Sequence, residues 1–160
     1  HTFSGSGVLT ESIVDGYTGA ATVIIIEGYT SIGDMAFNGR TGLTSVTIPN
    51  SVTNLPGQCF MLCDNLESII LSNTLTSLEN NCFNGCLKLG SITIPNSVTF
   101  MGHACFSECN LSIVYNNPAN ISLEEGFDYF TFEVNYNLFG LYNPPNINVK
   151  FSKLQTVLLL

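Results

Sequence analysis

The sequence predicts an α/β solenoid: a short parallel β-ladder on one face of a coil and short helical or 3₁₀ turns on the other. Two observations predict it. Phenylalanines recur at a step of 23 residues, at Phe37, Phe60, Phe83 and Phe106. A second apolar column keeps the same step, at Ile32, Leu55, Leu78 and Met101. A fixed period of this length is typical of arrays in which each unit buries its apolar edge only against its neighbours.

Each repeat contains three pieces, as residues 43–66 show. Residues 43–48 (Leu-Thr-Ser-Val-Thr-Ile) have apolar residues two apart with β-branched neighbours, which predicts a strand. Pro49 ends that strand because proline cannot donate to a ladder. Residues 52–55 form a second extended piece, and residues 56–65 have apolar positions three and four apart, which predicts helical or 3₁₀ turns. We align the first strand of the four repeats on Val23, Val46, Ile69 and Ile92.

This unit resembles the BspA-like leucine-rich repeat, a 23-residue repeat of cell-surface proteins. The resemblance rests on residues 43–52 (Leu-x-x-Val-x-Ile-Pro-Asn-Ser-Val) and 59–66 (Cys-Phe-x-x-Cys-x-x-Leu), and on their counterparts in the other repeats. It covers about residues 20–115, with Ser72 standing where the family usually has proline. The resemblance implies a leucine-rich-repeat solenoid and a surface adhesin that contacts a host or matrix protein.

We expect three parts. Residues 1–20 form an N-terminal lead, flexible over 1–7, with a capping strand at 8–14. Residues 21–115 form the array, with repeats at 21–43, 44–66, 67–89 and 90–111 plus a trailing strand. Residues 116–160 form a C-terminal cap or degenerate repeats, with candidate strands at 130–134 and 147–151. We also expect a piece of a longer protein, because repeat arrays rarely stop at four units.

The charge balance excludes two classes of partner. The chain has 4 basic and 12 acidic residues, so it lacks the basic patch that nucleic acid requires. The same deficit argues against anionic lipid, and no apolar run has the roughly 20 residues of a membrane-spanning helix. With the family resemblance, this balance predicts a cell-surface or secreted protein with a protein ligand.

No pattern in the sequence predicts a catalytic residue, a cofactor or a metal site, and we expect no enzyme activity. The six cysteines repeat as Cys-x₃-Cys, which favours buried free thiols; disulfides between adjacent repeats are the alternative, and zinc sites prefer other spacings. His103 stands at a tolerant turn position. An acidic loop exposed to solvent is expected at Glu124, Glu125, Asp128 and Glu133 rather than a calcium site, because the spacing of a calcium loop is absent.

One surface does predict binding. Strand residues between the inward-facing ones should form a small, uncharged strip on the open side of the ladder, which suits protein contact. The predicted strip comprises Thr22, Ile24, Ser45, Thr47, Ser68, Ile70, Ser91 and Thr93. Two alternatives stay open: these residues reflect only β-propensity in a structural spacer without a ligand, or an active site lies within 116–160.

Overall fold

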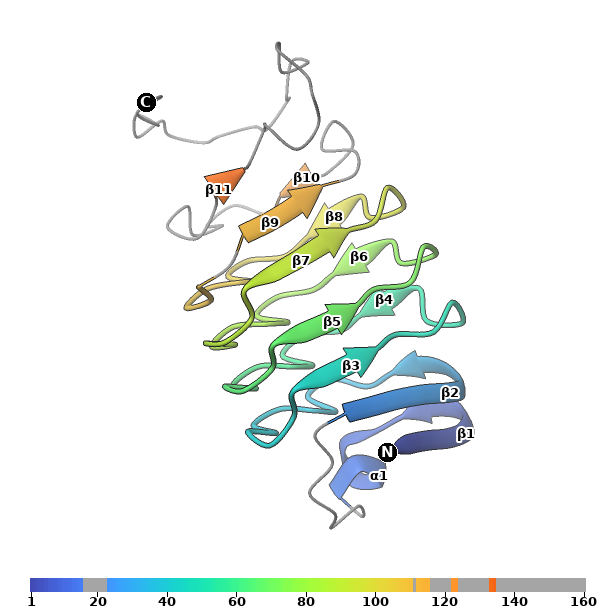
Figure 1. Ribbon diagram of the computed structural model, residues 1–160. Coiled ribbons are helices and arrows are strands. Elements are labelled where there is room, and N and C mark those ends of the chain that lie inside the picture. The colour runs from blue at the N-terminus through green and yellow to red at the C-terminus, as the bar shows by residue number, and fades with distance from the viewer. Residues whose placement is uncertain (16–22, 111, 116–121, 124–132, 135–160) are drawn as a thin grey trace.

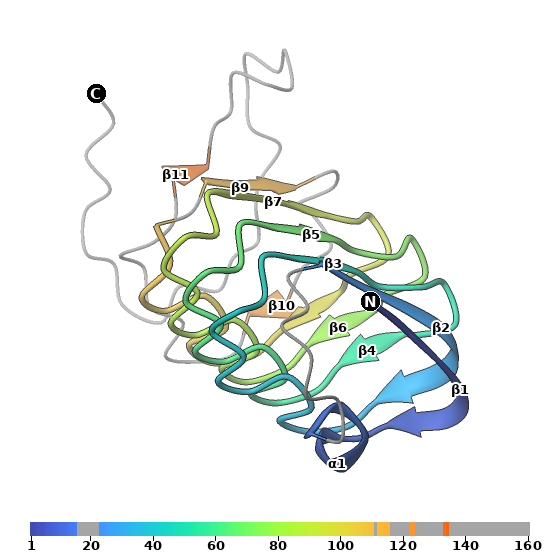
Figure 2. The same ribbon diagram turned by 60° about the horizontal axis from the view of Figure 1, so that its bottom comes forward.

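The repeats stack into one coil with three sides (Figures 1 and 2). The computed structural model describes residues 1–15, 23–110, 112–115, 122–123 and 133–134. One side carries a strand from each repeat, the next side carries a second, mostly shorter strand, and the third side carries turns. The predicted solenoid with its parallel ladder is confirmed.

Both strand-bearing sides are parallel ladders. The first side holds β3 (Ser45–Thr47), β5 (Ser68–Ile70), β7 (Ser91–Ile94), β9 (Ser112–Tyr115) and β11 (Glu133–Val134). The second side holds β4 (Asn54–Leu55), β6 (Ser77–Leu78), β8 (Phe100–Met101) and β10 (Ser122–Leu123). β11 falls within the candidate strand at 130–134, whereas residues 130–132 and the candidate strand at 147–151 lie outside the described residues.

The N-terminal segment differs from the prediction. The strand β1 (Thr2–Leu9) replaces the expected flexible lead, and the helix α1 (Glu11–Asp15) stands where a capping strand was predicted. β1 pairs in parallel with β2 (Val23–Ile32) and thereby adds a further coil. A glycine in each strand allows close packing: a Cβ on Gly28 of β2 would lie 2.2 Å from the carbonyl oxygen of Gly5 of β1.

The register of the first strand is also corrected. Ile24, and not Val23, pairs with Val46, so the first strand step is 22 residues instead of 23. The shorter step arises because only two residues, Glu27-Gly28, lie between the buried Ile26 and Tyr29 within β2, whereas three residues, Pro49-Asn50-Ser51, lie between the buried Ile48 and Val52 one repeat later. A shift of one residue turns every side chain of a strand to the opposite face.

The third side consists of successive turns rather than a regular helix. The N–H groups of Cys59 and Cys63 donate to carbonyls three residues earlier, as the apolar spacing predicts. The N–H groups of Gln58 and Leu62 instead donate to carbonyls of the next repeat. Both residues have φ of 57°, which interrupts the uniform negative φ of a helix. The turn side is therefore hydrogen-bonded between repeats, like the two strand-bearing sides.

The core is a row of parallel aromatic rings. The rings of Phe37, Phe60, Phe83 and Phe106 stack with centroids 5.0, 5.5 and 5.3 Å apart, and their planes differ by at most 4°. All four side chains are buried. Leucine columns, among them Leu43, Leu66 and Leu89, pack beside the rings. Each coil therefore packs against the next through an equivalent apolar surface, as the period predicts.

Gly102 marks a close contact between the backbones of adjacent repeats. A Cβ there would lie 2.2 Å from Oδ1 and 2.6 Å from the backbone nitrogen of Asn80. Backbone atoms cannot move aside within a stacked coil, so Gly102→Ala is expected to lower the free energy of unfolding by about 1–3 kcal/mol, the usual cost of overpacking. Urea unfolding followed by circular dichroism measures the loss.

The matched control is Gly90→Ala, because a Cβ on Gly90 meets no atom within 4 Å. This variant is expected to keep the stability of the parent chain. Equal losses in the two variants would mean that the repeats are not in this close contact.

Candidate protein-binding surface

The open side of the first ladder forms an uncharged surface. Its outward-facing residues pair across neighbouring strands: Val23 with Ser45, Ser45 with Ser68, and Thr47 with Ile70. A hydrogen bond of 3.0 Å runs from Ser68 Oγ to Ser45 Oγ. We call this surface the outer strip, and it consists of Val23, Ile25, Ser45, Thr47, Ser68, Ile70, Ser91 and Thr93.

The outer strip differs from the predicted strip at its N-terminal end. Ile24 is only 5% exposed and packs in the core, so its prediction as a contact residue is wrong. Val23 and Ile25 face outward instead, at 48% and 43% exposure. The cause is the 22-residue first step, and comparing the two-residue link Glu27-Gly28 with the three-residue link Pro49-Asn50-Ser51 would have revealed it. Thr22, also predicted, lies outside the described residues.

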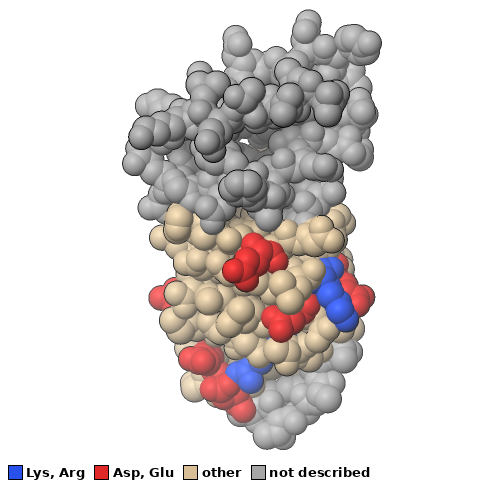
Figure 3. All heavy atoms as spheres, turned by 90° about the vertical axis from the view of Figure 1, so that its left-hand side faces the viewer, with Lys and Arg blue, Asp and Glu red and all other residues tan. Residues whose placement is uncertain are grey.

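The outer strip is more apolar than predicted. Ile70 is 63% exposed. With Val23 and Ile25, it gives the outer strip three exposed aliphatic side chains among the small hydroxyl-bearing ones. No member of the strip carries a charge. Away from the strip, on the side from which β3, β5 and β7 start, the few acidic and basic side chains form small groups within a mostly uncharged surface, and each basic group lies against an acidic one (Figure 3).

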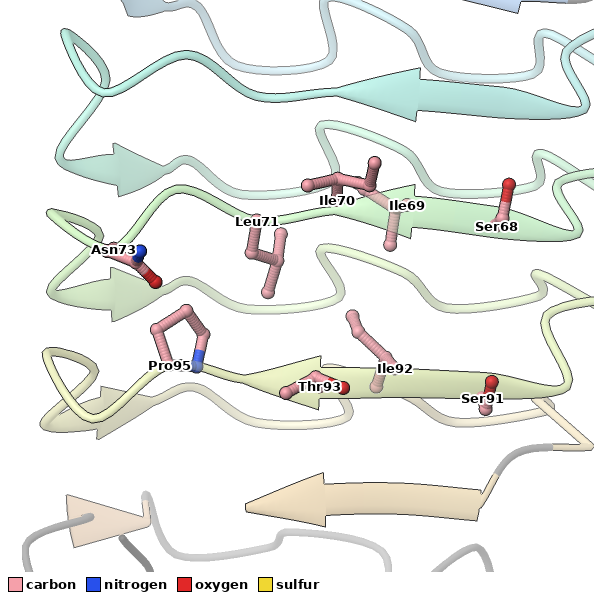
Figure 4. A pocket seen from close by; sticks show the side chains of 9 residues that line it. All are labelled: Ser68, Ile69, Ile70, Leu71, Asn73, Ser91, Ile92, Thr93 and Pro95. Atoms are coloured by element: carbon pink, nitrogen blue, oxygen red, sulfur yellow. The ribbon is translucent and has the colours of Figure 1, made fainter. Parts of the chain in front are cut away.

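A groove interrupts the first ladder between β5 and β7 (Figure 4). β5 ends one sheet, with strand order β1-β2-β3-β5, and β7 begins another, with order β7-β9-β11. The groove has a volume of about 380 Å³, and four residues of the outer strip line it: Ser68, Ile70, Ser91 and Thr93. Pro95 and Asn73 lie toward the end where the strands finish.

The six cysteines are buried free thiols, as the spacing favoured. The Sγ atoms of Cys63, Cys86 and Cys109 each donate to a phenylalanine carbonyl 26 residues earlier, at 3.1, 3.2 and 3.0 Å. Burial raises the pKa of the Cys63 thiol to about 12. A hydrogen bond with Cys109, together with burial, raises the pKa of Cys86. The thiols of Cys63 and Cys86 are therefore protonated at neutral pH, which is opposite to what a nucleophile needs. The hydrogen bond with Cys86 lowers the pKa of Cys109, the other member of this pair.

The remaining candidate residues do not form a reactive group where the structure describes them. His103 is exposed on a turn, and its backbone N–H donates to Asn80 Oδ1 at 2.8 Å. Cys105, its neighbour in sequence, is fully buried. No group of three potential metal ligands occurs among the described residues. Of the four acidic residues at 124–133, only Glu133 lies in a described element.

The first repeat differs from the later ones at one buried column. Arg40 stands where later repeats have cysteine, and it forms an ion pair with Asp15 of α1, with 33% of its side chain exposed. The column that holds cysteine in later repeats is thus partly exposed to solvent at the first repeat. Within the described part of the chain, no helix has the length and apolar character needed to cross a bilayer.

The stacked parallel strands, the phenylalanine row and the turn side define a leucine-rich-repeat solenoid. The sequence profile for the BspA type leucine rich repeat region matches residues 16–137 in six copies. The chain belongs to this family. Leucine-rich repeats are commonly protein-interaction modules, and they are typically not enzymes. No curated protein matches the chain.

Solved bacterial structures have the same fold. A leucine-rich repeat protein from Bacteroides capillosus ATCC 29799 is 28% identical, with a TM-score of 0.58 over 69% of this chain and 86% of that one. One from Eubacterium ventriosum ATCC 27560 is 23% identical, with a TM-score of 0.64 over 76% of this chain and 34% of that one. The T. pallidum leucine-rich repeat protein is 20% identical, with a TM-score of 0.55 over 67% of this chain and 60% of that one. The chain thus spans less than two thirds of the T. pallidum protein and about one third of the Eubacterium ventriosum protein.

Proposed function

We propose that this array is a non-enzymatic binding module of a cell-surface or secreted protein, and that it contacts a host or matrix protein through the outer strip. The observation that carries the proposal is the strip itself, an exposed surface without charge on which Val23, Ile25 and Ile70 present aliphatic side chains. The centres of protein interfaces are depleted of charge in the same way.

The size of the strip limits the strength of each contact. Four strands spaced by about 4.8 Å give a strip roughly 20 Å long. A standard interface buries about 800 Å² on each partner, which is more than such a strip offers. Contact through several arrays, or through more repeats, would raise the avidity of the whole protein. We therefore expect weak binding by one copy and stronger binding when copies are clustered on a surface.

Lysine substitution tests the outer strip. The triple variant Ile25→Lys, Thr47→Lys, Ile70→Lys places three ammonium groups on the surface without altering the core. Binding to an immobilised basement-membrane extract, measured by surface plasmon resonance with clustered protein, is expected to fall at least about tenfold, a loss of roughly 1.4 kcal/mol.

The control places the same charges elsewhere on the coil. Thr53→Lys, Leu87→Lys, Asn96→Lys changes three exposed residues outside the outer strip and should leave binding unchanged. If the strip variant binds as well as this control, the outer strip is not the contact surface and the array acts as a spacer.

A further inference from the structure

We propose that the pair Cys86 and Cys109 is an oxidation site: a hydroperoxide oxidises Cys109, and Cys86 then closes a disulfide between the third and fourth repeats. The repeat alone makes this pair equivalent to the other pairs of cysteines one repeat apart. Its place in the coil, its access to solvent and its hydrogen bonds distinguish it. The inference does not depend on the outer strip, which lies on another side of the coil.

The two thiols lie near bonding range. The rings of Phe83 and Phe106, three residues before each cysteine, have centroids 5.3 Å apart and planes that differ by 2°. The two coils are therefore related at this place by a shift of about one strand spacing, roughly 5 Å. Equivalent atoms of Cys86 and Cys109 lie about that far apart. Disulfides join Cα atoms about 4.4–6.8 Å apart, and the Cβ atoms have to approach by only about 1 Å.

The side chain of Cys109 reaches back to the coil that holds Cys86. The carbonyl oxygen of Phe83 accepts the N–H of Cys86 at 3.1 Å, and it also accepts the S–H of Cys109 at 3.0 Å. Because both donors meet at one oxygen, the Cys109 sulfur lies beside the backbone of Cys86. A side-chain hydrogen bond links the two thiols directly.

Cys109 is the thiol that solvent can reach. Its exposed fraction is 5%, whereas each of the other five cysteines is 0% exposed. A small oxidant has to reach only one sulfur of a pair, because the second step takes place between the two residues themselves. The burial of Cys86 is therefore compatible with the reaction.

Hydrogen bonding also prepares Cys109 to react, since the thiolate is the nucleophilic form of cysteine. The hydrogen bond with the Cys86 thiol lowers the pKa of Cys109 by more than burial raises it, and the N–H of Cys86 lowers it further. Burial instead raises the pKa of Cys63 to about 12, and it raises that of Cys105 above the usual 9.0. Cys109 therefore ionises before these thiols.

The reaction balances with one hydroperoxide, ROOH. The Cys109 thiolate attacks the O–O bond, which forms a sulfenic acid and releases an alkoxide that takes up the proton lost by Cys109. The Cys86 sulfur then attacks the Cys109 sulfur. The S–O bond breaks, and hydroxide leaves with the Cys86 proton as water. Two thiols and ROOH thus give a disulfide, ROH and water, and the two electrons lost by the sulfurs reduce the O–O bond.

The test is oxidation of the folded whole chain with hydrogen peroxide, followed by mass spectrometry. We expect the loss of two hydrogen atoms and a fall from six titratable thiols to four after unfolding. A peptic fragment should contain Cys86 linked to Cys109, and dithiothreitol should restore all six thiols. A link between any other pair, added oxygen without a link, or six unreacted thiols would overturn the proposal.

Three variants test the order of the steps. Cys86→Ser lacks the second thiol, so the sulfenic acid at Cys109 should persist and be trapped by dimedone. Cys109→Ser should react with peroxide at least tenfold more slowly than the parent chain. The matched control Cys63→Ser, from the same column, should form the link at the parental rate. Equal slowing in Cys109→Ser and Cys63→Ser would mean that peroxide does not enter at Cys109. The mapped link in the parent chain decides the proposal if a variant fails to fold.

The disulfide should hold the two coils together beside an existing backbone contact. The N–H of Gly85 donates to Ser107 O at 2.9 Å, close to both cysteines in sequence. After oxidation this amide should exchange with solvent at least tenfold more slowly, as followed by NMR. The amide of Phe37, which donates to Cys59 O between earlier coils, is the internal control and should keep its rate. An unchanged rate at Gly85 would contradict a bond between these coils.

Discussion

Phe83→Ala is expected to lower the free energy of unfolding by about 3–5 kcal/mol, the range found when a buried aromatic ring is truncated. The ring is fully buried and stacks on Phe60 at 5.5 Å and on Phe106 at 5.3 Å. Its loss leaves a cavity between two coils. It also weakens the coupling through which each repeat stabilises the next. Urea unfolding monitored by circular dichroism should show the loss as a lower midpoint.

The control for this variant is another phenylalanine. Phe100 lies in β8 and is only half-buried, outside the stacked row. Phe100→Ala should therefore cost clearly less than Phe83→Ala, and Phe83→Leu should recover part of the loss by filling the cavity. A cost for Phe83→Ala no greater than that for Phe100→Ala would mean that the aromatic row does not hold the coils together.

The period of the sequence predicts the fold well because stacked coils place equivalent residues in equivalent surroundings. Phe37 and Phe83 are two repeats apart, yet each has a ring of the next coil against its face. The same holds for the cysteine columns, whose small thiols fit beside the rings. An apolar residue type that recurs at a fixed step therefore predicts which side chains are buried, even when the turns between the strands are not known.

The period does not predict features that depend on one residue more or less. The two-residue link Glu27-Gly28 within β2 shifts the first part of that strand by one position, which buries Ile24 and exposes Val23. The sequence held that signal, since Ile26 to Tyr29 is one residue shorter than Ile48 to Val52. A hydrophobic column alone cannot show it, because residues 23–26 are all aliphatic.

Close contact between coils is a second feature that the period hides. Gly5 and Gly7 indicated a flexible lead, but they lie in β1, where Gly5 packs against the ring of Tyr29. The groove between β5 and β7 is a third feature of this kind. Ser72 departs visibly from the repeat, but no sequence pattern displays its hydrogen bond to the carbonyl of Val52 in the preceding coil.

At pH above 9 the array is expected to lose stability steeply. Burial raises the pKa of Cys63 from its usual 9.0 to about 12, and burial also raises those of Cys59 and Cys82 well above 9.0. Below pH 9 these thiols are protonated in the folded and unfolded states alike. Above it the unfolded chain releases their protons while the folded chain retains them, so the unfolded state gains free energy of ionisation.

The slope of this loss identifies its cause. Each thiol with such a shift removes about 1.4 kcal/mol of stability per pH unit until the pH reaches its folded pKa, which for Cys63 is about 12. Several thiols acting together should unfold the array within about two units above pH 9, as measured by circular dichroism alongside thiolate absorbance. Cys63→Ala removes one of these groups and should make the slope shallower by about one thiol's share. An unchanged slope would show that the alkaline transition arises from other groups, and that Cys63 is not sealed in the core as its contact with the Phe37 carbonyl requires.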